Sequence, residues 1–385
     1  MSKVRVQKLG EVATVVSGST PKTSVDEYWN GNYNWVTPAE ISENTVIITH
    51  TERKITKKAI KEANLKLLPV GTVLLSSRAP IGKVAIAGTE MYCNQGFKNL
   101  ICSDEIHNMY LFWFLRGKTA LLNSMGRGAT FKEISKSIVE QIEIPLPPLE
   151  TQKQIAKTLN TAAVLLAMRK QQLAELDNLI KSIFYEMFGE NNIYIEKSLI
   201  ELIVEGSGLS YGIVQPGEDI GKGIGILRPI DINHGTISMT NIKRIPPDVE
   251  EPYKKTRLNG NEILITVRGT TGETALTDQK HMGMNVTRGI AVIRQNNSLI
   301  NRIFLNEYLK SGIGQRFIRE NTKGATLKQI NLSVLREMRI SLPPLPLQKQ
   351  FAARVTKIEE QKALVQKAID ETQYLFDSLM SEYFE

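Results

Sequence analysis

The sequence predicts a mixed α/β protein with two similar globular domains, each followed by a long helix. Residues 146–154 read LPPLETQKQ and residues 342–350 read LPPLPLQKQ, so one motif occurs twice, 196 residues apart. A long repeat that occurs only twice indicates a duplicated domain and not a solenoid. Short strand-like segments precede both motifs, and long segments with helical periodicity follow them.

The duplication extends beyond the motif in both directions. Gly128-Ala129-Thr130 matches Gly324-Ala325-Thr326 at the same offset of 196, and Arg78 matches Arg268 at an offset of 190. The segments 11–65 and 201–257, in contrast, share little sequence. Each copy therefore combines a similar tail with a body that has diverged.

Composition and charge fit a protein with two cores. The chain has 385 residues, 42% of them hydrophobic, and Lys plus Arg outnumber Asp plus Glu by 48 to 40, which gives a net charge of +8. A basic surface favours a polyanionic partner, although many basic proteins bind none. No apolar run approaches the roughly 20 residues of a membrane span, and the N-terminus does not resemble a signal peptide. Because Cys93 and Cys102 are the only cysteines, we expect small core residues in a cytoplasmic protein and no disulfide framework.

The bodies are expected to contain many short strands. Residues 70–76 and 262–266 are apolar runs edged by turn residues, as in buried strands. Tight Gly-containing loops follow at 78–82 and 268–272.

Helical segments and basic loops come next in both copies. Residues 109–122 and 299–315 have helical patterns, and Gly-rich basic loops follow at 124–130 and 320–326. Arg or Lys beside Ser, Thr and Asn suits contacts to phosphates and bases. The alternative for any single loop is that its glycine only turns the chain.

A long helix is expected after each motif. Apolar residues recur at alternating steps of four and three from 155 to 187 and again from 351 to 383. A mean spacing of 3.5 is typical of a coiled-coil seam, whereas a helix lying on its own domain would drift to 3.6. The predicted seam consists of Ile155, Leu159, Leu166, Leu173, Leu176, Ile180, Ile183, Met187, Phe351, Val355, Ile358, Val365, Ile369, Phe376, Leu379 and Tyr383.

The two helices are each other's natural partners. Each runs for roughly 50 Å without Gly or Pro, and Gly189 is expected to end the first. The domain between them allows either direction, and we favour an antiparallel coiled coil with pseudo-two-fold symmetry. The expected divisions are 1–149 and 190–345 for the recognition bodies and 150–189 and 346–385 for the helices.

Motifs for catalysis or cofactor binding are missing from the sequence. The glycines between 217 and 223 have the wrong spacing for a phosphate-binding loop, and Gly206-Ser207-Gly208 is only a fragment of a dinucleotide fingerprint. Residues 247–255 only faintly resemble a nuclease pattern. The four histidines lack metal-ligand spacing: His50, His107, His234 and His281. We therefore expect a non-catalytic recognition protein that binds no metal or cofactor itself.

Together these features resemble the specificity (S) subunit of type I restriction-modification enzymes over the full length. The paired LPPL-x-x-QKQ motifs carry the resemblance, each following a variable body and leading into a long helix. The segments 8–21 and 35–41 are similar to the start of such a body, with 227–232 as the second copy of the latter. Ser17-Gly18-Ser19 has only a loose counterpart near 205–209.

The resemblance implies a DNA-binding role. Each body would be a target-recognition domain that reads one half of a bipartite duplex site, and the helices would set the half-site spacing and dock two modification (methyltransferase) subunits. A restriction subunit, an endonuclease and translocase, would join the full complex. S-adenosylmethionine, ATP and Mg²⁺ would be used by these partners.

Candidate DNA contacts are residues whose side chains suit phosphates or base edges. They are Ser19, Lys22, Arg78, Lys98, Arg127 and Lys132 in the first domain and Tyr211, Arg228, Arg268, Arg288, Lys323 and Lys328 in the second. Two other functions remain open: a fused methyltransferase or nuclease, and a scaffold whose bodies bind proteins. Activity of this chain alone would favour the first, and co-purifying proteins without DNA the second.

Overall fold

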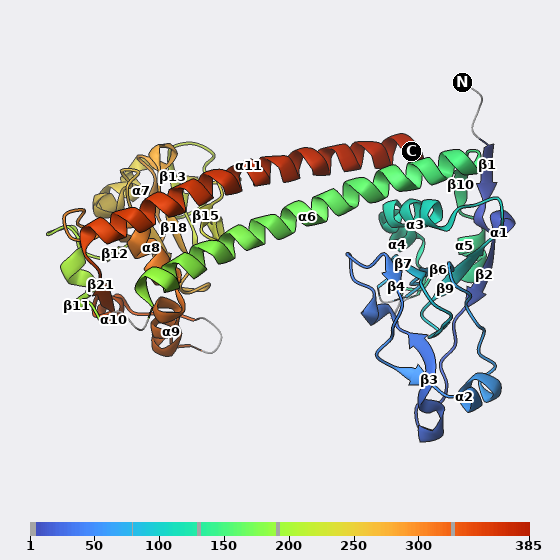
Figure 1. Ribbon diagram of the computed structural model, residues 1–385. Helices are drawn as coiled ribbons and strands as arrows, with labels where there is room; N and C mark the ends of the chain where they lie inside the picture. The colour runs from blue at the N-terminus through green and yellow to red at the C-terminus, as the bar shows by residue number, and fades with distance from the viewer. Residues whose placement is uncertain (1–4, 79, 129–131, 190–192, 325–327) are drawn as a thin grey trace. The chain divides into compact units, whose positions relative to one another are not determined.

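The computed structural model describes residues 5–78, 80–128, 132–189, 193–324 and 328–385. The chain forms two compact units (Figure 1). Unit 1 comprises Met1–Lys170 with Lys367–Glu385, and unit 2 comprises Gln171–Gln366. Both units mix helices and sheets, and a helix of 40 residues follows each body. The predicted fold class, two similar mixed domains each followed by a long helix, is confirmed.

The body of unit 1 has a five-stranded sheet with the order β2-β9-β6-β7-β4, a three-stranded sheet with the order β5-β3-β8, and the pair β1-β10. Its strands are β1 (Arg5–Lys8), β2 (Ala13–Ser17), β3 (Trp29–Val36), β4 (Ile47–Ile48), β5 (Lys54–Ile55), β6 (Val73–Leu75), β7 (Val84–Ala87), β8 (Tyr92–Cys93), β9 (Lys98–Cys102) and β10 (Glu143–Leu146). Its α-helices are α1 (Leu9–Val12), α2 (Lys57–Glu62), α3 (Asn108–Gly117), α4 (Thr119–Met125) and α5 (Lys136–Glu140), and 3-10 helices span Asp26–Tyr28 and Pro38–Glu40.

The body of unit 2 has a four-stranded sheet with the order β12-β20-β17-β18, a three-stranded sheet with the order β16-β13-β19, and the pairs β14-β15 and β11-β21. Its strands are β11 (Ile195–Ser198), β12 (Ser210–Tyr211), β13 (Ile224–Leu227), β14 (Ile232–Asn233), β15 (Thr236–Ile237), β16 (Lys243–Ile245), β17 (Ile263–Thr266), β18 (Thr274–Leu276), β19 (Asn285–Val286), β20 (Ile290–Ile293) and β21 (Arg339–Leu342). Its α-helices are α7 (Pro247–Glu250), α8 (Arg302–Lys310), α9 (Gly312–Asn321) and α10 (Leu332–Arg336). Four 3-10 helices span Leu199–Leu202, Pro229–Asp231, Glu251–Thr256 and Gln279–His281.

The two bodies share one strand arrangement despite their different sequences. In unit 1, β3 runs antiparallel to β5 and parallel to β8, and in unit 2, β13 runs antiparallel to β16 and parallel to β19. The central strands also agree, because Val73 of β6 pairs with Ile86 and Leu100 while Ile263 of β17 pairs with Leu276 and Ile293. The duplication therefore includes the segments whose sequences show almost no likeness.

Each helical segment expected near the end of a body is divided into two helices. In unit 1 the segment becomes α3 and α4, and in unit 2 it becomes α8 and α9. Ser311 separates α8 from α9 and its side chain accepts a hydrogen bond from the backbone N of Gly314. A Cβ on Gly314 would lie 2.4 Å from the carbonyl oxygen of Tyr308, so the two helices meet where only glycine fits. Helical periodicity does not reveal such a break, because both halves keep an apolar face.

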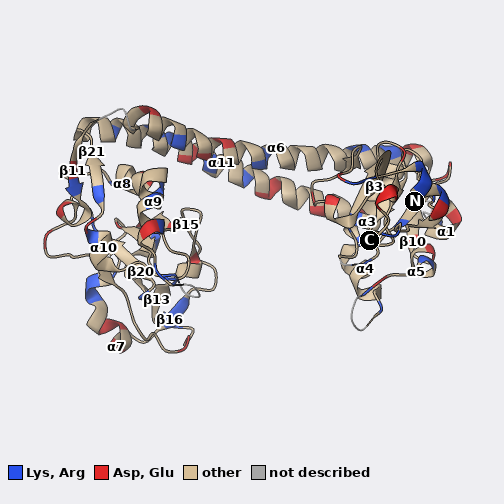
Figure 2. Cartoon of the chain, turned by 90° about the horizontal axis from the view of Figure 1, so that it is seen from below, with Lys and Arg blue, Asp and Glu red and all other residues tan. Residues whose placement is uncertain are grey.

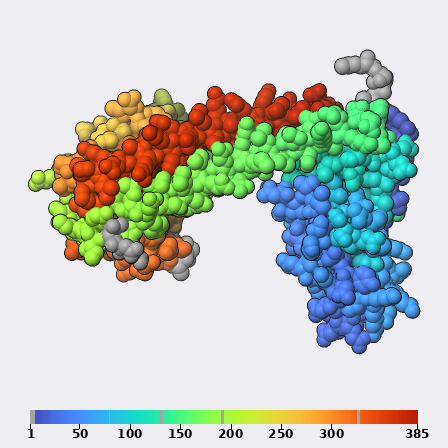
Figure 3. All heavy atoms as spheres, viewed as in Figure 1, coloured from blue at the N-terminus to red at the C-terminus, as the bar shows by residue number. Residues whose placement is uncertain are grey.

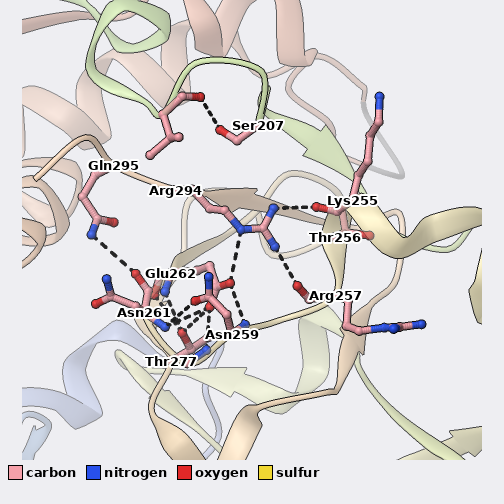
Figure 4. Close-up of polar contacts among 12 residues, drawn as sticks. Ser207, Lys255, Thr256, Arg257, Asn259, Asn261, Glu262, Thr277, Arg294 and Gln295 are labelled. Carbon is pink, nitrogen blue, oxygen red and sulfur yellow. Dashed lines mark hydrogen bonds and ion pairs between the residues drawn. The ribbon is translucent and has the colours of Figure 1, made fainter.

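A buried carboxylate fixes the start of β17 in unit 2 (Figure 4). Glu262 is fully buried and accepts hydrogen bonds from the backbone N of Asn259 at 2.8 Å and from Thr277 Oγ1 at 2.9 Å. Arg294 pairs with it at 3.3 Å and also donates to the carbonyl of Arg257 at 2.7 Å. A buried charge is tolerated when it is paired and hydrogen-bonded, so this network holds segment 255–262 against the sheet.

The repeated motif turns the chain from a strand into a long helix. β10 and β21 both end directly before a pair of prolines. The long helices α6 (Leu149–Phe188) and α11 (Leu345–Phe384) begin directly after these pairs. Gln152 is fully buried, donates to the carbonyl of Pro147 at 2.9 Å and accepts from the backbone N of His107 at 2.9 Å. Gln348 repeats this with Pro343 at 2.7 Å and Asn301 at 2.8 Å. The first glutamine of each QKQ therefore anchors the helix to the body before it.

The two long helices pair in opposite directions within each unit. In unit 1, Arg169 of α6 donates to Thr372 of α11, and Phe384 packs on Tyr110 with ring centroids 5.2 Å apart. In unit 2, Asp177 of α6 pairs with Lys362 of α11 at 2.6 Å. The N-terminal half of α6 thus lies beside the C-terminal half of α11 in unit 1, and the remaining halves pair in unit 2. The antiparallel direction expected from the sequence is confirmed within each unit.

The predicted seam residues form the buried stripe of these helices. Every one of them is buried or half-buried, whereas most residues between them are exposed. A second stripe faces the bodies, and it includes Phe184, Phe188 and Phe384. Each helix therefore packs against both its partner helix and a body. Residues of both charge signs are interspersed along the two helices (Figure 2).

Candidate nucleic-acid interface

Four loops meet at one edge of the body in unit 1, and we call this surface the recognition rim. It consists of residues 37–40 after β3, 76–78 and 80–82 after β6, residues 94–98 from the turn after β8 to the start of β9, and residues 127–128 and 132–133, which an antiparallel bridge joins and which we call the hairpin. The backbone N of Ser77 donates to the carbonyl of Gly96 at 2.7 Å. A Cβ on Gly96 would lie 3.4 Å from Pro38 and 3.7 Å from Arg78, so the first three loops are in contact.

The hairpin completes the rim. Arg127 and Glu133 exchange backbone hydrogen bonds of 3.0 and 2.9 Å, and the backbone N of Ile134 donates to the carbonyl of Ser77 at 2.9 Å. Gly128 has a φ of 132°, a conformation that favours glycine. Ala129 and Thr130 of the repeated Gly-Ala-Thr lie outside the described residues. The basic loop expected from the sequence is thus fastened beside the end of β6.

Unit 2 builds the same rim from matching residues. Lys323 and Gln329 exchange backbone hydrogen bonds of 2.8 Å each, and the backbone N of Ile330 donates to the carbonyl of Val267 at 3.0 Å. A Cβ on Gly289 would lie 2.5 Å from Pro229, which brings the turn after β19 against the 3-10 helix Pro229–Asp231. Ala325 and Thr326 lie outside the described residues. The rim of unit 2 consists of 228–231, 266–272, 287–289, and 323–324 with 328–329.

The segment of the second body that corresponds to Ser17-Gly18-Ser19 lies elsewhere than the sequence comparison predicted. A Cβ on Gly18 would lie 1.8 Å from the carbonyl oxygen of Asn94, and a Cβ on Gly212 would lie 1.8 Å from that of Val286. Both positions follow the outer strand of the larger sheet and exclude any side chain. The counterpart of Ser17-Gly18-Ser19 is therefore the segment around Gly212, and the placement near 205–209 was wrong. Sequence matching missed it because only the glycine is shared.

The rim of unit 1 collects four of the six candidate residues predicted there. Arg127 and Lys132 are exposed on the hairpin, and Arg78 is half-buried after β6. Lys98 at the start of β9 is only 8% exposed. Ser19 is half-buried and its carbonyl accepts from Trp35 Nε1 at 3.2 Å, while Lys22 is exposed.

The rim of unit 2 also collects candidate residues. Arg288, Lys323 and Lys328 are exposed, and Arg268 is half-buried after β17. Tyr211 is 38% exposed at the end of β12, the edge strand of the larger sheet.

Arg228 differs from the other cations of this rim. Its Nε and Nη2 donate to the Asp231 carboxylate at 3.0 and 2.8 Å. Hydrogen bonding to that carboxylate raises the pKa of the Arg228 guanidinium. A side chain held in this bidentate pair orders the loop that contains it and is less available to a ligand.

Sequence reasoning missed three polar residues on the rims. Gln95 is exposed on the turn that corresponds to the one carrying Arg288. Glu133 and Gln329 close the two hairpins and occupy the same position in each. They could have been found by extending the repeat alignment one residue past Gly-Ala-Thr-Phe-Lys and Gly-Ala-Thr-Leu-Lys. The search for cations alone passed over them.

The described cysteines, acidic residues and helices offer no site for thiol, metal or membrane chemistry. Burial raises the pKa of the Cys93 thiol to about 12 and that of the Cys102 thiol to about 12, so both are protonated at neutral pH. Within the described ranges, no group of three or more His, Cys, Asp or Glu side chains is placed to hold a metal ion. No helix among the described residues combines the length and apolar character needed to cross a bilayer.

Comparison with known proteins identifies the family. A family model described as the type I restriction modification DNA specificity domain matches residues 1–178 and 228–373. The chain belongs to this family. The two matched regions cover most of both bodies and both helices, in agreement with the internal duplication.

Relatives of this specificity-family chain are similar over most of their length. The specificity subunit of the type I restriction enzyme MjaIX from Methanocaldococcus jannaschii is 29% identical, over 97% of this chain and 91% of that protein. The EcoBI specificity subunit from Escherichia coli is 24% identical, over 69% of this chain and 62% of that protein.

Solved structures of type I restriction-modification systems have the same fold. The crystal structure of an S subunit from M. genitalium covers 100% of this chain and 97% of its own, with a TM-score of 0.58 and 15% identity. A chain from a type I system whose assembly and conformational transition were studied covers 98% of this specificity-family chain and 97% of its own, with a TM-score of 0.61 and 19% identity. At these identities the likeness concerns the fold alone.

Proposed function

We propose that this chain is the DNA-specificity subunit of a type I restriction-modification complex and that each body reads one half of a bipartite duplex site. The observation that carries this proposal is the duplicated rim. Two bodies of different sequence place the same four loops together, and both rims carry exposed Arg or Lys. Two different half-sites require the same placement of loops on the DNA but different side chains in those loops, and this combination is present in the two bodies.

The rim side chains would make two kinds of contact with DNA, one to phosphates and one to base edges. Exposed cations such as Arg127, Lys132 and Lys323 suit phosphate contacts, which fix the position of a protein on a duplex and weaken with salt. Base edges would be read by side chains that offer paired donors and acceptors, such as Gln95 or Gln329 toward adenine and Arg288 toward guanine. Ser19, Lys22 and Tyr211 remain candidates at the margin of this surface.

The long helices would set the half-site spacing and dock two methyltransferase subunits. In unit 1 a groove of about 530 Å³ runs between α6 and α11 and is lined by Thr161, Leu165 and Leu375, among others. Leu165 is 42% exposed, Leu375 is 54% exposed and the nearby Met168 is 63% exposed. In each unit, outward sides of α6 and α11 are uncovered in Figure 3. Exposed apolar side chains in a groove are typical of a protein-binding surface.

This chain would be non-catalytic and bind no cofactor. S-adenosylmethionine would be used by the methyltransferase subunits, and ATP and Mg²⁺ by the restriction subunit. The protonated thiols of the buried Cys93 and the half-buried Cys102 agree with a structural role for both cysteines. The DNA substrate places the proposed complex in the cytoplasm.

Binding measurements on the complex with its methyltransferase subunits test this function. We expect binding to duplex DNA that weakens steeply with salt, and we expect Arg127→Ala to reduce the salt slope by about one. Lys66→Ala, which removes an exposed cation outside the rim, is the matched control. A complex that binds no duplex would contradict the proposal. So would transfer of a labelled methyl group by this chain alone.

A further inference from the structure

Among the positions at which the two rims differ is the one occupied by Glu133 in unit 1 and by Gln329 in unit 2. Glu133 is the acidic side chain nearest the rim cations of unit 1. Its Oε1 lies 3.0 Å from the ammonium of Lys98 and its Oε2 lies 3.9 Å from the guanidinium of Arg78. The Lys98 side chain is only 10% exposed and donates also to Ser77 Oγ at 3.4 Å. One carboxylate therefore holds two cations of this rim.

The strand register identifies the residues that replace this cluster in unit 2. Ser76 bridges Phe97 in unit 1, and Thr266 pairs with Ile290 in unit 2. Counting one residue onward from Phe97 and from Ile290 aligns Lys98 with Ala291. The acid and its buried cation are thus both replaced by neutral side chains, Gln329 and Ala291. The two differences go together, since either charge alone would lack its partner.

Arg268 is left without the partner that Arg78 has. Arg268 corresponds to Arg78 at the end of the central strand, and both precede a Gly-containing loop. Among the described residues, Arg268 takes part in no ion pair or side-chain hydrogen bond with the protein. Arg127 and Lys132 in unit 1 correspond to the cations Lys323 and Lys328 in unit 2. Arg228 and Arg288 of unit 2 have the neutral counterparts Thr37 and Gln95 in unit 1. The rims therefore differ in the partner of the Arg78/Arg268 guanidinium and in the exposed Arg288 of unit 2.

We infer that position 133/329 sets how strongly each body holds the DNA backbone. The inference rests on the proposed function and specifies it further. In unit 1, a phosphate near Arg78 would face the Glu133 carboxylate, and like charges at short range repel. In unit 2, Arg268 meets no such competitor and makes one more phosphate contact. Unit 2 is thus the body that anchors the complex on DNA of any sequence, and unit 1 depends more on its base contacts.

Reciprocal substitutions test this asymmetry. The variants are Gln329→Glu, which gives Arg268 a carboxylate, and the double variant Glu133→Gln/Lys98→Ala, which copies unit 2 into unit 1. Each is assembled with its methyltransferase subunits, and affinity for a random-sequence duplex of about 40 base pairs is measured against salt. We expect Gln329→Glu to weaken binding about five- to tenfold and to lower the salt slope by about 0.9. The double variant should tighten binding and raise the slope by about the same amount.

Two controls separate charge from folding. Gln329→Ala removes the side chain without adding a charge and should leave the salt slope unchanged. Thermal unfolding of each variant shows whether its body is intact, and the opposite expected signs exclude a shared loss of structure. If the wild-type complex binds DNA and both variants keep its salt slope, the inference is overturned and the proposed function stands. If the wild-type complex binds no duplex, the proposed function fails and this inference fails with it.

Discussion

Gln152 and Gln348 give the repeated motif a physical role at the scale of single residues. Each side chain is fully buried and links a proline carbonyl to the backbone N at the start of a body helix, that is, α3 or α8. The two prolines before each helix stop the strand, and the glutamine then fixes the helix start against the body. The motif is the same in both copies because the same joint is built twice.

Replacing one of these glutamines should destabilise its unit. Gln348→Leu leaves the backbone N of Asn301 and the carbonyl of Pro343 buried without their partner, and each unsatisfied group costs about 1–3 kcal/mol. We expect the free energy of unfolding to fall by about 2–4 kcal/mol in urea titrations. Gln350→Leu changes an exposed residue of the same motif and should have little effect. Equal stability of the two variants would refute the anchoring role.

A buried histidine makes the stability of unit 2 depend on pH. His281 is 1% exposed, and burial lowers its pKa, an effect that Asp278 at 2.8 Å opposes without cancelling. The unfolded chain then binds the proton more readily, so stability is full above the ordinary histidine pKa and is lost as pH falls below it. Between about pH 7.5 and about pH 5.5 we expect the melting temperature to fall less in His281→Gln than in the wild type. Equal pH dependence in both proteins would exclude His281 as the cause.

At the scale of elements, the long helices combine an apolar seam with a few polar pairs. Arg169 contacts Thr372 in unit 1, and Lys362 contacts Asp177 in unit 2. Polar residues at seam positions fix the register of paired helices at a cost in stability. Arg169, Lys362 and Thr372 occupy seam positions in the alternating four-and-three spacing, and each has a partner on the facing helix.

One seam substitution tests the pairing and the proposed docking together. Leu176 is half-buried and packs against the core of unit 2, so Leu176→Asp places a charge where it is poorly solvated. We expect a loss of about 2–4 kcal/mol in stability and weaker assembly with methyltransferase subunits in size-exclusion chromatography. Asn178→Asp is the matched control, since it adds the same charge at an exposed polar position of the same helix. Normal assembly by Leu176→Asp would show that the seam does not support docking.

The long helices α6 and α11 were the most predictable elements. Of their two buried faces, the sequence predicted only the one that contacts the other long helix. A spacing of 3.5 residues reports one buried stripe, so it identified the side on which α6 and α11 meet. Phe184, Phe188 and Phe384 lie on the second buried stripe, which follows no heptad because it contacts irregular bodies. The breaks between α3 and α4 and between α8 and α9 were likewise invisible to periodicity.

At the scale of the whole molecule, one strand order supports two divergent bodies. The sequence likeness between segments 11–65 and 201–257 is too weak to align, yet β3-β5-β8 and β13-β16-β19 pair in the same way. Backbone pairing depends on the alternation of buried positions and not on residue identity, so topology persists while loops change. The rim cations were predicted individually, but their assembly from four separate loops required the fold. Which side chain faces which base depends on those loops.

The central claim is that each body specifies its own half of one bipartite DNA site. The most direct measurement is methylation mapping of genomic DNA in cells that contain the methyltransferase subunits, with this chain present, absent, or carrying a foreign domain in place of residues 1–145. We expect methylation at a split motif only when the chain is present, and a change in one half of that motif after the exchange. Methylation that is independent of the chain, or an exchange that alters both halves or neither, would contradict the account.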